Sequence, residues 1–298
     1  MKIVSLIPSA TEIVFALGLG DSLSGVTFEC DYPVEARSKA VVSGTALHTD
    51  APLTAKEIDD AVSARVADGE AIYTLDAERI RDIQPDLIIA QDLCRVCAVP
   101  SGAVEDALEV LGCRADVISL DPTTLDEVIE CIAVVGDATD TARRARAVMD
   151  ELRTRVDIVR GAVVQHHRPR TFALEWSDPP FSGGHWVPDM IEAAGGDSVL
   201  ASSGERSRRL EWEEVDAADP HIAVFMPCGY TFDQAVDEGR RLLDVPALAR
   251  AEHIFATDAN ALFSRPGPRL VDGLEALAWA LHPRAFPAPP PRLVAALR

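Results

Sequence analysis

The sequence lacks long apolar runs and is poor in basic residues. Its 298 residues contain no run of about 18 apolar side chains, the length that a membrane-spanning helix needs. The formal net charge is −20, and only three of the 28 basic residues are lysines. Binding to nucleic acid or to an anionic membrane surface requires a basic face. We therefore expect no nucleic-acid partner and no membrane insertion.

The common catalytic signatures are also missing. The sequence has no GxSxG elbow, no GxxxxGK[ST] phosphate loop, no HExxH and no GxGxxG after a predicted strand. Gly18 and Gly20 end a predicted helix, which is typical of a helix cap and not of a cofactor loop. The absence of these motifs favours a binding protein over an enzyme.

The N-terminus lacks the pattern of a secretory leader. Met1 and Lys2 lead directly into the apolar run Ile3–Ile7, which Pro8 stops after one strand length. A leader would need a basic region, a longer apolar region and a small-residue cleavage site. We expect a cytoplasmic protein with mostly reduced cysteines; the alternative is an exported protein whose leader is absent from this sequence.

Short apolar runs alternate with helical patterns in both halves of the chain. Ser9–Glu12 resembles a capping box that opens a helix after the first run. Strands are predicted at Ile3–Ile7, Leu23–Thr27, Leu87–Ala90, Asp116–Leu120, Arg170–Glu175, Ile222–Met226 and His253–Thr257. This alternation predicts parallel sheets with helices on both faces, an α/β fold.

The middle of the chain is helical. Apolar residues keep helical spacing from Leu125 to Val135, Gly136 interrupts it, and the period continues to about Val164. The second piece has about 24 residues, or ~36 Å at 1.5 Å per residue, which suits a rigid connection between two lobes. We expect an N-terminal α/β lobe at 1–123, a helical linker with a long bridging helix at 124–166, and a C-terminal α/β lobe at 167–298.

Cysteine and acidic residues follow two strands of the first half. Ligands of open α/β sheets bind beyond the carboxyl ends of the strands, so these loops are well placed for binding. Glu29, Cys30 and Asp31 could ligate a metal, or form a polar loop with one buried cysteine. Cys94 and Cys97 form a CxxC that fits a metal site, a redox pair or two structural thiols.

Aromatic residues and a histidine follow the first strand of the second half. Such loops suit stacking on a flat ligand. A pair of arginines beside a helix N-terminus could bind an anion or form surface ion pairs. The candidate ligand contacts are Phe28, Glu29, Asp31, Trp176, Phe181, His185, Trp186, Tyr230, Arg265 and Arg269. The candidate metal ligands are Cys30, Cys94, Cys97, His185 and Cys228.

Several of these segments carry a family resemblance. Ile3–Glu12, followed by Leu17–Gly20 and Gly25–Thr27, resembles the opening of cobalamin- and iron-siderophore-binding proteins of ABC importers. The resemblance covers about residues 2–283. A narrower set is similar to a leaderless subgroup of the class III periplasmic-binding-protein superfamily, labelled cobalamin-binding: Glu29–Pro33, Asp92–Cys94 with Cys97, Gly184–Pro188 and Ser264–Arg269.

The resemblance implies two Rossmann-like lobes joined by the bridging helix, with a ligand held in the cleft between them. It implies a monomer and an ABC importer as partner, although importer-linked members carry a leader or lipid anchor that this sequence does not show. The leading hypothesis is non-catalytic binding of cobalamin or a related corrinoid. The alternatives are a metal ion, metal chelate or haem bound through the Cys/His cluster, and a redox or corrinoid-processing enzyme with a reactive thiol.

Overall fold

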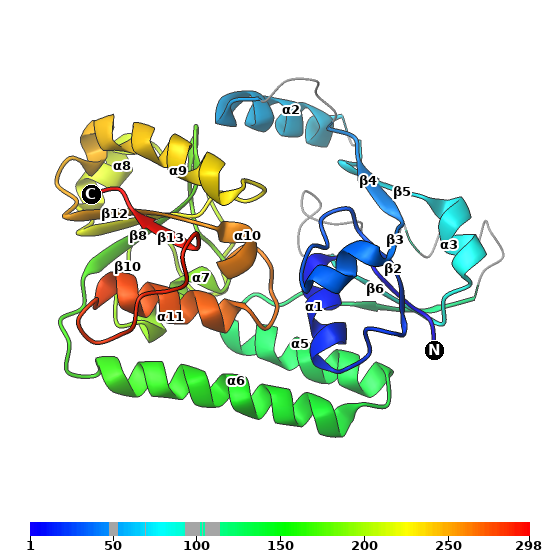
Figure 1. The fold of residues 1–298 in the computed structure, drawn as a ribbon. Coiled ribbons are helices and arrows are strands. Elements are labelled where there is room, and N and C mark those ends of the chain that lie inside the picture. Colours follow the sequence, from blue (N-terminus) through cyan, green and yellow to red (C-terminus); the bar gives the residue numbers. More distant parts are fainter. Residues whose placement is uncertain (48–52, 69, 93–101, 103, 105–113) are drawn as a thin grey trace. The chain divides into compact units, whose positions relative to one another are not determined.

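The chain forms two compact units in a computed structural model that describes residues 1–47, 53–68, 70–92, 102, 104 and 114–298 (Figure 1). The first unit contains Met1–Asp121 and Glu130–Met149, and the second contains Pro122–Ile129 and Asp150–Arg298. The helical segment expected at 124–166 is thus divided between the two units. The three-part boundaries drawn from the sequence stay a prediction.

The first unit is built on a parallel sheet in the order β3-β2-β1-β6-β7. Apolar residues of β1 and β6 lie in its core, because a sheet with helices on both faces exposes neither side to water. Its strands are β1 (Ile3–Ser5), β2 (Leu23–Val26), β3 (Ala40–Val41), β6 (Leu87–Ala90) and β7 (Asp116–Ser119). A separate antiparallel pair joins β4 (Ser43–Thr45) to β5 (Tyr73–Leu75).

Proline, and not a capping box, begins the first helix. Helix α1 spans Pro8–Ala16 with Ile7 as the N-cap residue, and Ser9, Thr11 and Glu12 lie buried inside the helix. The predicted capping box at Ser9–Glu12 is therefore wrong. Pro8 has a fixed φ and no N–H, so it fits the first helical position and moves the helix start ahead of Ser9. Other helices that the structure describes in this region are η1 (Val34–Ser38), α2 (Ala55–Ala67) and α3 (Ala77–Ile83).

Two consecutive helices occupy the middle of the chain, α5 (Leu125–Ala138) and α6 (Ala142–Val163). The break between them lies at 139–141 and not at the predicted Gly136. Gly136 lies inside α5. A Cβ there would lie 2.5 Å from Cβ of Ala145, so its missing side chain lets the two helices approach each other. The long helix predicted to end near Val164 is confirmed.

The second unit has a sheet in the order β10-β8-β11-β12-β13, with β9 added to β8. The first four strands are mutually parallel, whereas β13 and β9 pair in the antiparallel sense. The strands are β8 (Arg170–Ser177), β9 (Pro180–Ser182), β10 (Asp197–Ser198), β11 (Ile222–Phe225), β12 (His253–Thr257) and β13 (Val294–Ala296).

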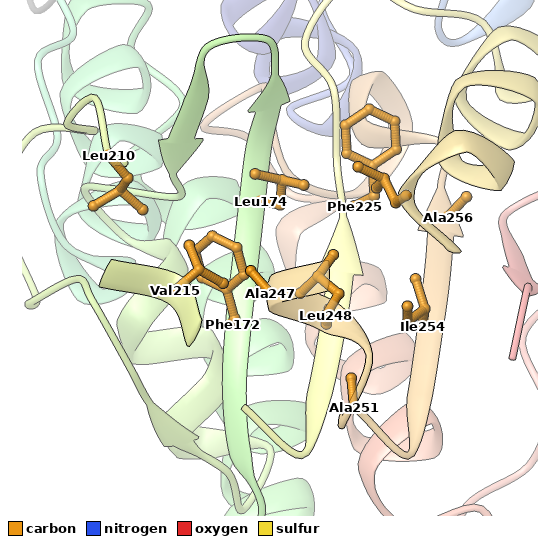
Figure 2. Close-up of a cluster of buried hydrophobic side chains, with 12 residues drawn as sticks. Phe172, Leu174, Leu210, Val215, Phe225, Ala247, Leu248, Ala251, Ile254 and Ala256 are labelled. Carbon is orange, nitrogen blue, oxygen red and sulfur yellow. The ribbon is translucent and has the colours of Figure 1, made fainter. Parts of the chain in front are cut away.

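Alternate residues of three adjacent strands form one core of the second unit. Phe172 and Leu174 of β8, Phe225 of β11 and Ile254 of β12 are almost fully buried in one cluster (Figure 2). Successive strand residues point to opposite faces, so this spacing places all four on the same side of the sheet. Besides the parts of α5 and α6 that belong to it, this unit has the helices α7 (Val187–Ala193), α8 (Trp212–Ala218), α9 (Phe232–Arg241), α10 (Ala259–Leu262) and α11 (Leu270–Leu281), with short η2 (Leu242–Asp244) and η3 (Pro246–Leu248). None of the described helices is both long and apolar enough to cross a membrane.

A forked ion pair fastens α6 to α11 within the second unit. Nε and Nη2 of Arg155 donate to Glu275 at 2.9 and 2.7 Å, and Nη2 also donates to Asp272 at 2.6 Å. The hydrogen bonds that Arg155 donates to Glu275, followed by the one that it donates to Asp272, raise the pKa of Arg155 above its ordinary value. Paired guanidinium–carboxylate bonds of this kind exceed the strength of ordinary surface ion pairs.

We predict that Arg155→Gln lowers the free energy of unfolding of the second unit by about 1–2 kcal/mol, because the side chain is only partly exposed and makes several charge-assisted bonds. Urea denaturation followed by circular dichroism measures this. Arg160→Gln on the same helix is the control: its contact with Asp157 is 3.9 Å long, so we expect a change under about 0.5 kcal/mol. If both substitutions lowered the free energy of unfolding equally, the stabilising role given to the Arg155 ion pair would be wrong.

Candidate ligand-binding site

Most of the described candidate residues lie at the carboxyl ends of parallel strands or in the segments that directly follow them. The loop at 27–33 follows β2 in the first unit. In the second unit, the turn between β8 and β9 and the loop at 226–231 follow β8 and β11. Because parallel strands end at the same edge, the loops of one sheet share that edge. This is the edge where open α/β sheets bind ligands.

The first-unit loop presents an aromatic ring and carboxylates. Phe28 is 44% exposed, and its ring lies 6.0 Å from the ring of Tyr73, centroid to centroid. The Tyr73 hydroxyl donates a hydrogen bond to the Glu29 carboxylate at 3.5 Å. Asp31, two residues further along the loop, is half-buried. Tyr73 was missed by the sequence analysis, because it comes from β5, in another part of the chain.

Cys30 is part of a buried hydroxyl network. It is 4% exposed, and its Sγ lies 3.1 Å from the hydroxyls of both Thr11 and Thr27. The Thr11 hydroxyl also donates to Ser5 at 2.9 Å. These contacts favour the expected alternative of a polar loop with one small buried cysteine.

The metal hypothesis receives no support from the described residues. Among them, no group of three or more His, Cys, Asp or Glu side chains is placed to hold a metal ion. Cys228 is exposed. Cys94 and Cys97 lie outside the described residues, so the cysteine cluster remains a prediction.

The second unit presents a partly exposed aromatic row. The rings of Trp176 and Tyr230 meet edge to face, with centroids 5.3 Å apart. Trp176 on β8 pairs directly with Phe181 on β9, and all three side chains are half-buried. Burial, with a smaller effect of the Glu238 carboxylate, raises the pKa of Tyr230, so its hydroxyl stays a hydrogen-bond donor at neutral pH.

Trp186, in contrast, is a core residue. It is 6% exposed, and its indole Nε1 donates to the backbone oxygen of Phe263 at 2.8 Å. A ring in this position holds α7 against the loop before α11. The expected role of Trp186 in ligand contact therefore has no support in this arrangement.

His185 is held in a left-handed backbone conformation by the segment that follows β10. Its φ is +54°, its N–H donates to Glu205 O at 2.6 Å, and its carbonyl accepts from Gly204 N–H at 3.0 Å. The ring atom Nε2 is buried and has no hydrogen-bond partner among the described residues. Burial lowers the pKa of His185, and the charge of Arg206 lowers it further, so the ring is neutral at pH 7. A buried Nε2 cannot reach a ligand unless this segment moves.

That segment, residues 204–210, is here called the strap, and the sequence analysis missed it. Ser182 N–H donates to Arg208 O at 3.0 Å, and Leu210 N–H donates to Pro180 O at 2.8 Å, so the strap extends the β8–β9 ribbon. The Ser207 hydroxyl also donates to the carboxylate of Glu175. A Cβ on Gly184 would lie 2.2 Å from the backbone N of Ser207, which explains why a glycine stands there.

Arg265 and Arg269 lie beside the start of α11, where Arg269 is the N-cap residue. Both arginines already interact with other groups of the chain. The proposed anion site at this helix end therefore remains a prediction.

A separate cavity of about 540 Å³ lies in the second unit, beside the amino end of β8. Side chains of both charges line it, including Asp126, Arg160, Arg168 and Glu192. It lies away from the carboxyl ends of the strands. No sequence motif pointed to it, because its walls come from α5, α6 and α7.

With this geometry in place, comparison with known proteins decides the family. Residues 3–261 match the family model described as periplasmic binding protein. The chain belongs to this family. It is 26% identical over 281 residues to a Vitamin B12-binding protein of Vibrio cholerae, covering 92% of this chain and 86% of that protein. It is 23% identical over 297 residues to an uncharacterized ABC transporter substrate-binding lipoprotein of Bacillus subtilis, covering 96% of this chain and 81% of that protein.

The solved structures confirm the class III periplasmic-binding-protein fold. A periplasmic haem-binding protein of Pseudomonas aeruginosa superimposes with a TM-score of 0.71 at 22% identity, covering 99% of this chain and 97% of that one. The family and these relatives are substrate-binding proteins and not enzymes, which confirms the expectation of a non-catalytic protein.

We predict that Gly184→Ala displaces the strap, because the new methyl group would overlap backbone atoms that no rotamer change can move. The free energy of unfolding of the second unit should fall by about 1–3 kcal/mol. Gly161→Ala is the matched control. Its Cβ would meet nothing within 4 Å inside α6, so stability should rise by about 0.5–1 kcal/mol. Urea titrations of the two variants that gave equal shifts would contradict the packing of the strap on Gly184.

Proposed function

We propose that the protein binds cobalamin or a related corrinoid without transforming it. The observation that carries this proposal is the partly exposed row of Trp176, Phe181 and Tyr230 at the carboxyl ends of β8 and β11. Aromatic side chains of this kind pack well on a broad, flat ligand. The name of the Vibrio relative as a Vitamin B12-binding protein supports the same ligand class.

The charge of the first-unit loop favours a corrinoid over haem. Glu29 and Asp31 place two carboxylates in the same loop as the exposed ring of Phe28. The rim of a corrinoid carries amide N–H donors, which carboxylates accept well. The rim of haem carries carboxylates, which Glu29 and Asp31 would repel.

Haem or a metal chelate is the second candidate. The fold neighbour described as a haem-binding protein favours it, while ligation through the buried ring of His185 would require the strap to move. This candidate requires ligation through His185 or through Cys94 and Cys97. If Cys94 and Cys97 are the ligands, serine at either position should abolish binding of the haem or metal chelate, whereas cobalamin binding should survive the change.

Delivery to an ABC importer is the biological role that the relatives suggest. The Bacillus relative is named as a substrate-binding lipoprotein of such a transporter, and the family is described as periplasmic. We therefore infer export as the better proposal and an importer as the partner. The leaderless subgroup, the cytoplasmic location and the monomeric state stay predictions without support.

Calorimetric titration with cobalamin tests the proposal. After purification without added ligand, and with the absorbance spectrum and metal content recorded, we expect saturable binding of one cobalamin per chain and no stoichiometric metal. Trp176→Leu should weaken binding about tenfold through loss of aromatic contact. Trp279→Leu is the control, since its ring packs on Phe255 of β12. No cobalamin binding together with a haem band or bound metal would overturn the proposal in favour of the second candidate.

A further inference from the structure

A positively charged side chain, that of Arg209, lies at the end of the aromatic row in the second unit. Trp176 pairs with Phe181 across β8 and β9, and Phe181 pairs with Arg209 of the strap in an antiparallel bridge. Residues directly opposite each other in neighbouring strands share one face of a ribbon. Trp176, Phe181 and Arg209 therefore form one transverse row, with Tyr230 against its first member.

The pairing geometry brings Phe181 and Arg209 close together. The flanking bonds, Ser182 N–H to Arg208 O and Leu210 N–H to Pro180 O, enclose the Phe181–Arg209 pair without using its own backbone groups. This is the non-hydrogen-bonded type of antiparallel pair, in which the Cα atoms are only about 4.5 Å apart and the side chains are closer than in the other type. The aliphatic part of the Arg209 side chain therefore begins beside the side chain of Phe181.

The charge of Arg209 is available to a ligand. Its side chain is exposed, and it forms no ion pair with any described residue. Its neighbour Arg208, which projects from the opposite face of the strap, pairs with Glu214 at 2.9 Å. What sets Arg209 apart is its position: it lies directly opposite Phe181, at the end of the aromatic row, where its guanidinium can meet an anionic group of a ligand that rests on that row.

We propose that Arg209 binds an anionic group of a flat ligand that rests on Trp176 and Phe181. The inference rests on the proposed function and adds a chemical requirement to it: the ligand carries a phosphodiester or a carboxylate at its rim. For a corrinoid, this group is the phosphodiester of the nucleotide loop. For haem, it is a propionate. The guanidinium fork suits either anion.

The experiment compares wild type, Arg209→Gln and Arg208→Gln in titrations with cobalamin, with cobinamide (a corrinoid without the nucleotide loop) and with haemin. Arg209→Gln should weaken cobalamin binding about tenfold and leave cobinamide binding unchanged. Arg208 projects from the other face of the same strand, so Arg208→Gln should change neither cobalamin binding nor cobinamide binding. Circular dichroism melting curves confirm that both variants stay folded.

The outcomes separate this inference from the proposed function. If wild type binds cobalamin and Arg209→Gln binds it equally well, or loses cobalamin and cobinamide equally, the anion role is overturned and the proposed function stands. If wild type binds haemin alone and Arg209→Gln weakens it, the anion role stands with a propionate as its source and the proposed function fails. If wild type binds none of the three, both are overturned.

Discussion

The parallel direction of the central strands is the constraint on which the candidate site depends. A parallel pair needs a crossover, and each crossover begins with a loop at the carboxyl edge of the sheet. In the second unit, β8 and β11 pair from Thr171↔Ile222 to Leu174↔Phe225, so the loops after them start side by side. Trp176 and Tyr230 meet for that reason, although 54 positions separate them in the sequence.

The strap further stabilises this edge of the sheet. It prolongs the β8–β9 ribbon by backbone hydrogen bonds, fixes the left-handed turn at His185 and reaches Glu175 through Ser207. Its close contact with Gly184 leaves no space for any side chain there. The backbone hydrogen bonds of the strap to Pro180 and Ser182 thus fix where Arg208 and Arg209 lie along the ribbon.

Local patterns predicted the strands well, because each is a short apolar run bounded by turn residues; Leu87–Ala90 agrees with β6 at both ends. The start of α1 was mispredicted, since the backbone restriction of Pro8 outweighs a side-chain cap at Ser9. The sequence did not predict which residues that are distant along the chain contact each other. Nothing near Trp186 in sequence reveals that Phe263 accepts its indole hydrogen, and nothing near Arg209 reveals its partner Phe181. Cross-strand partners depend on the whole topology.

Hydrogen–deuterium exchange with and without saturating cobalamin tests the central claim most directly, because it reports where on each unit the ligand lies. The account predicts slower exchange of backbone amides in the loop at 27–33, in 175–185, in the strap and in 226–231, with α6 and the 540 Å³ cavity unchanged. Slower exchange confined to the cavity residues around Arg160 and Glu192, with the aromatic row unaffected, would contradict it.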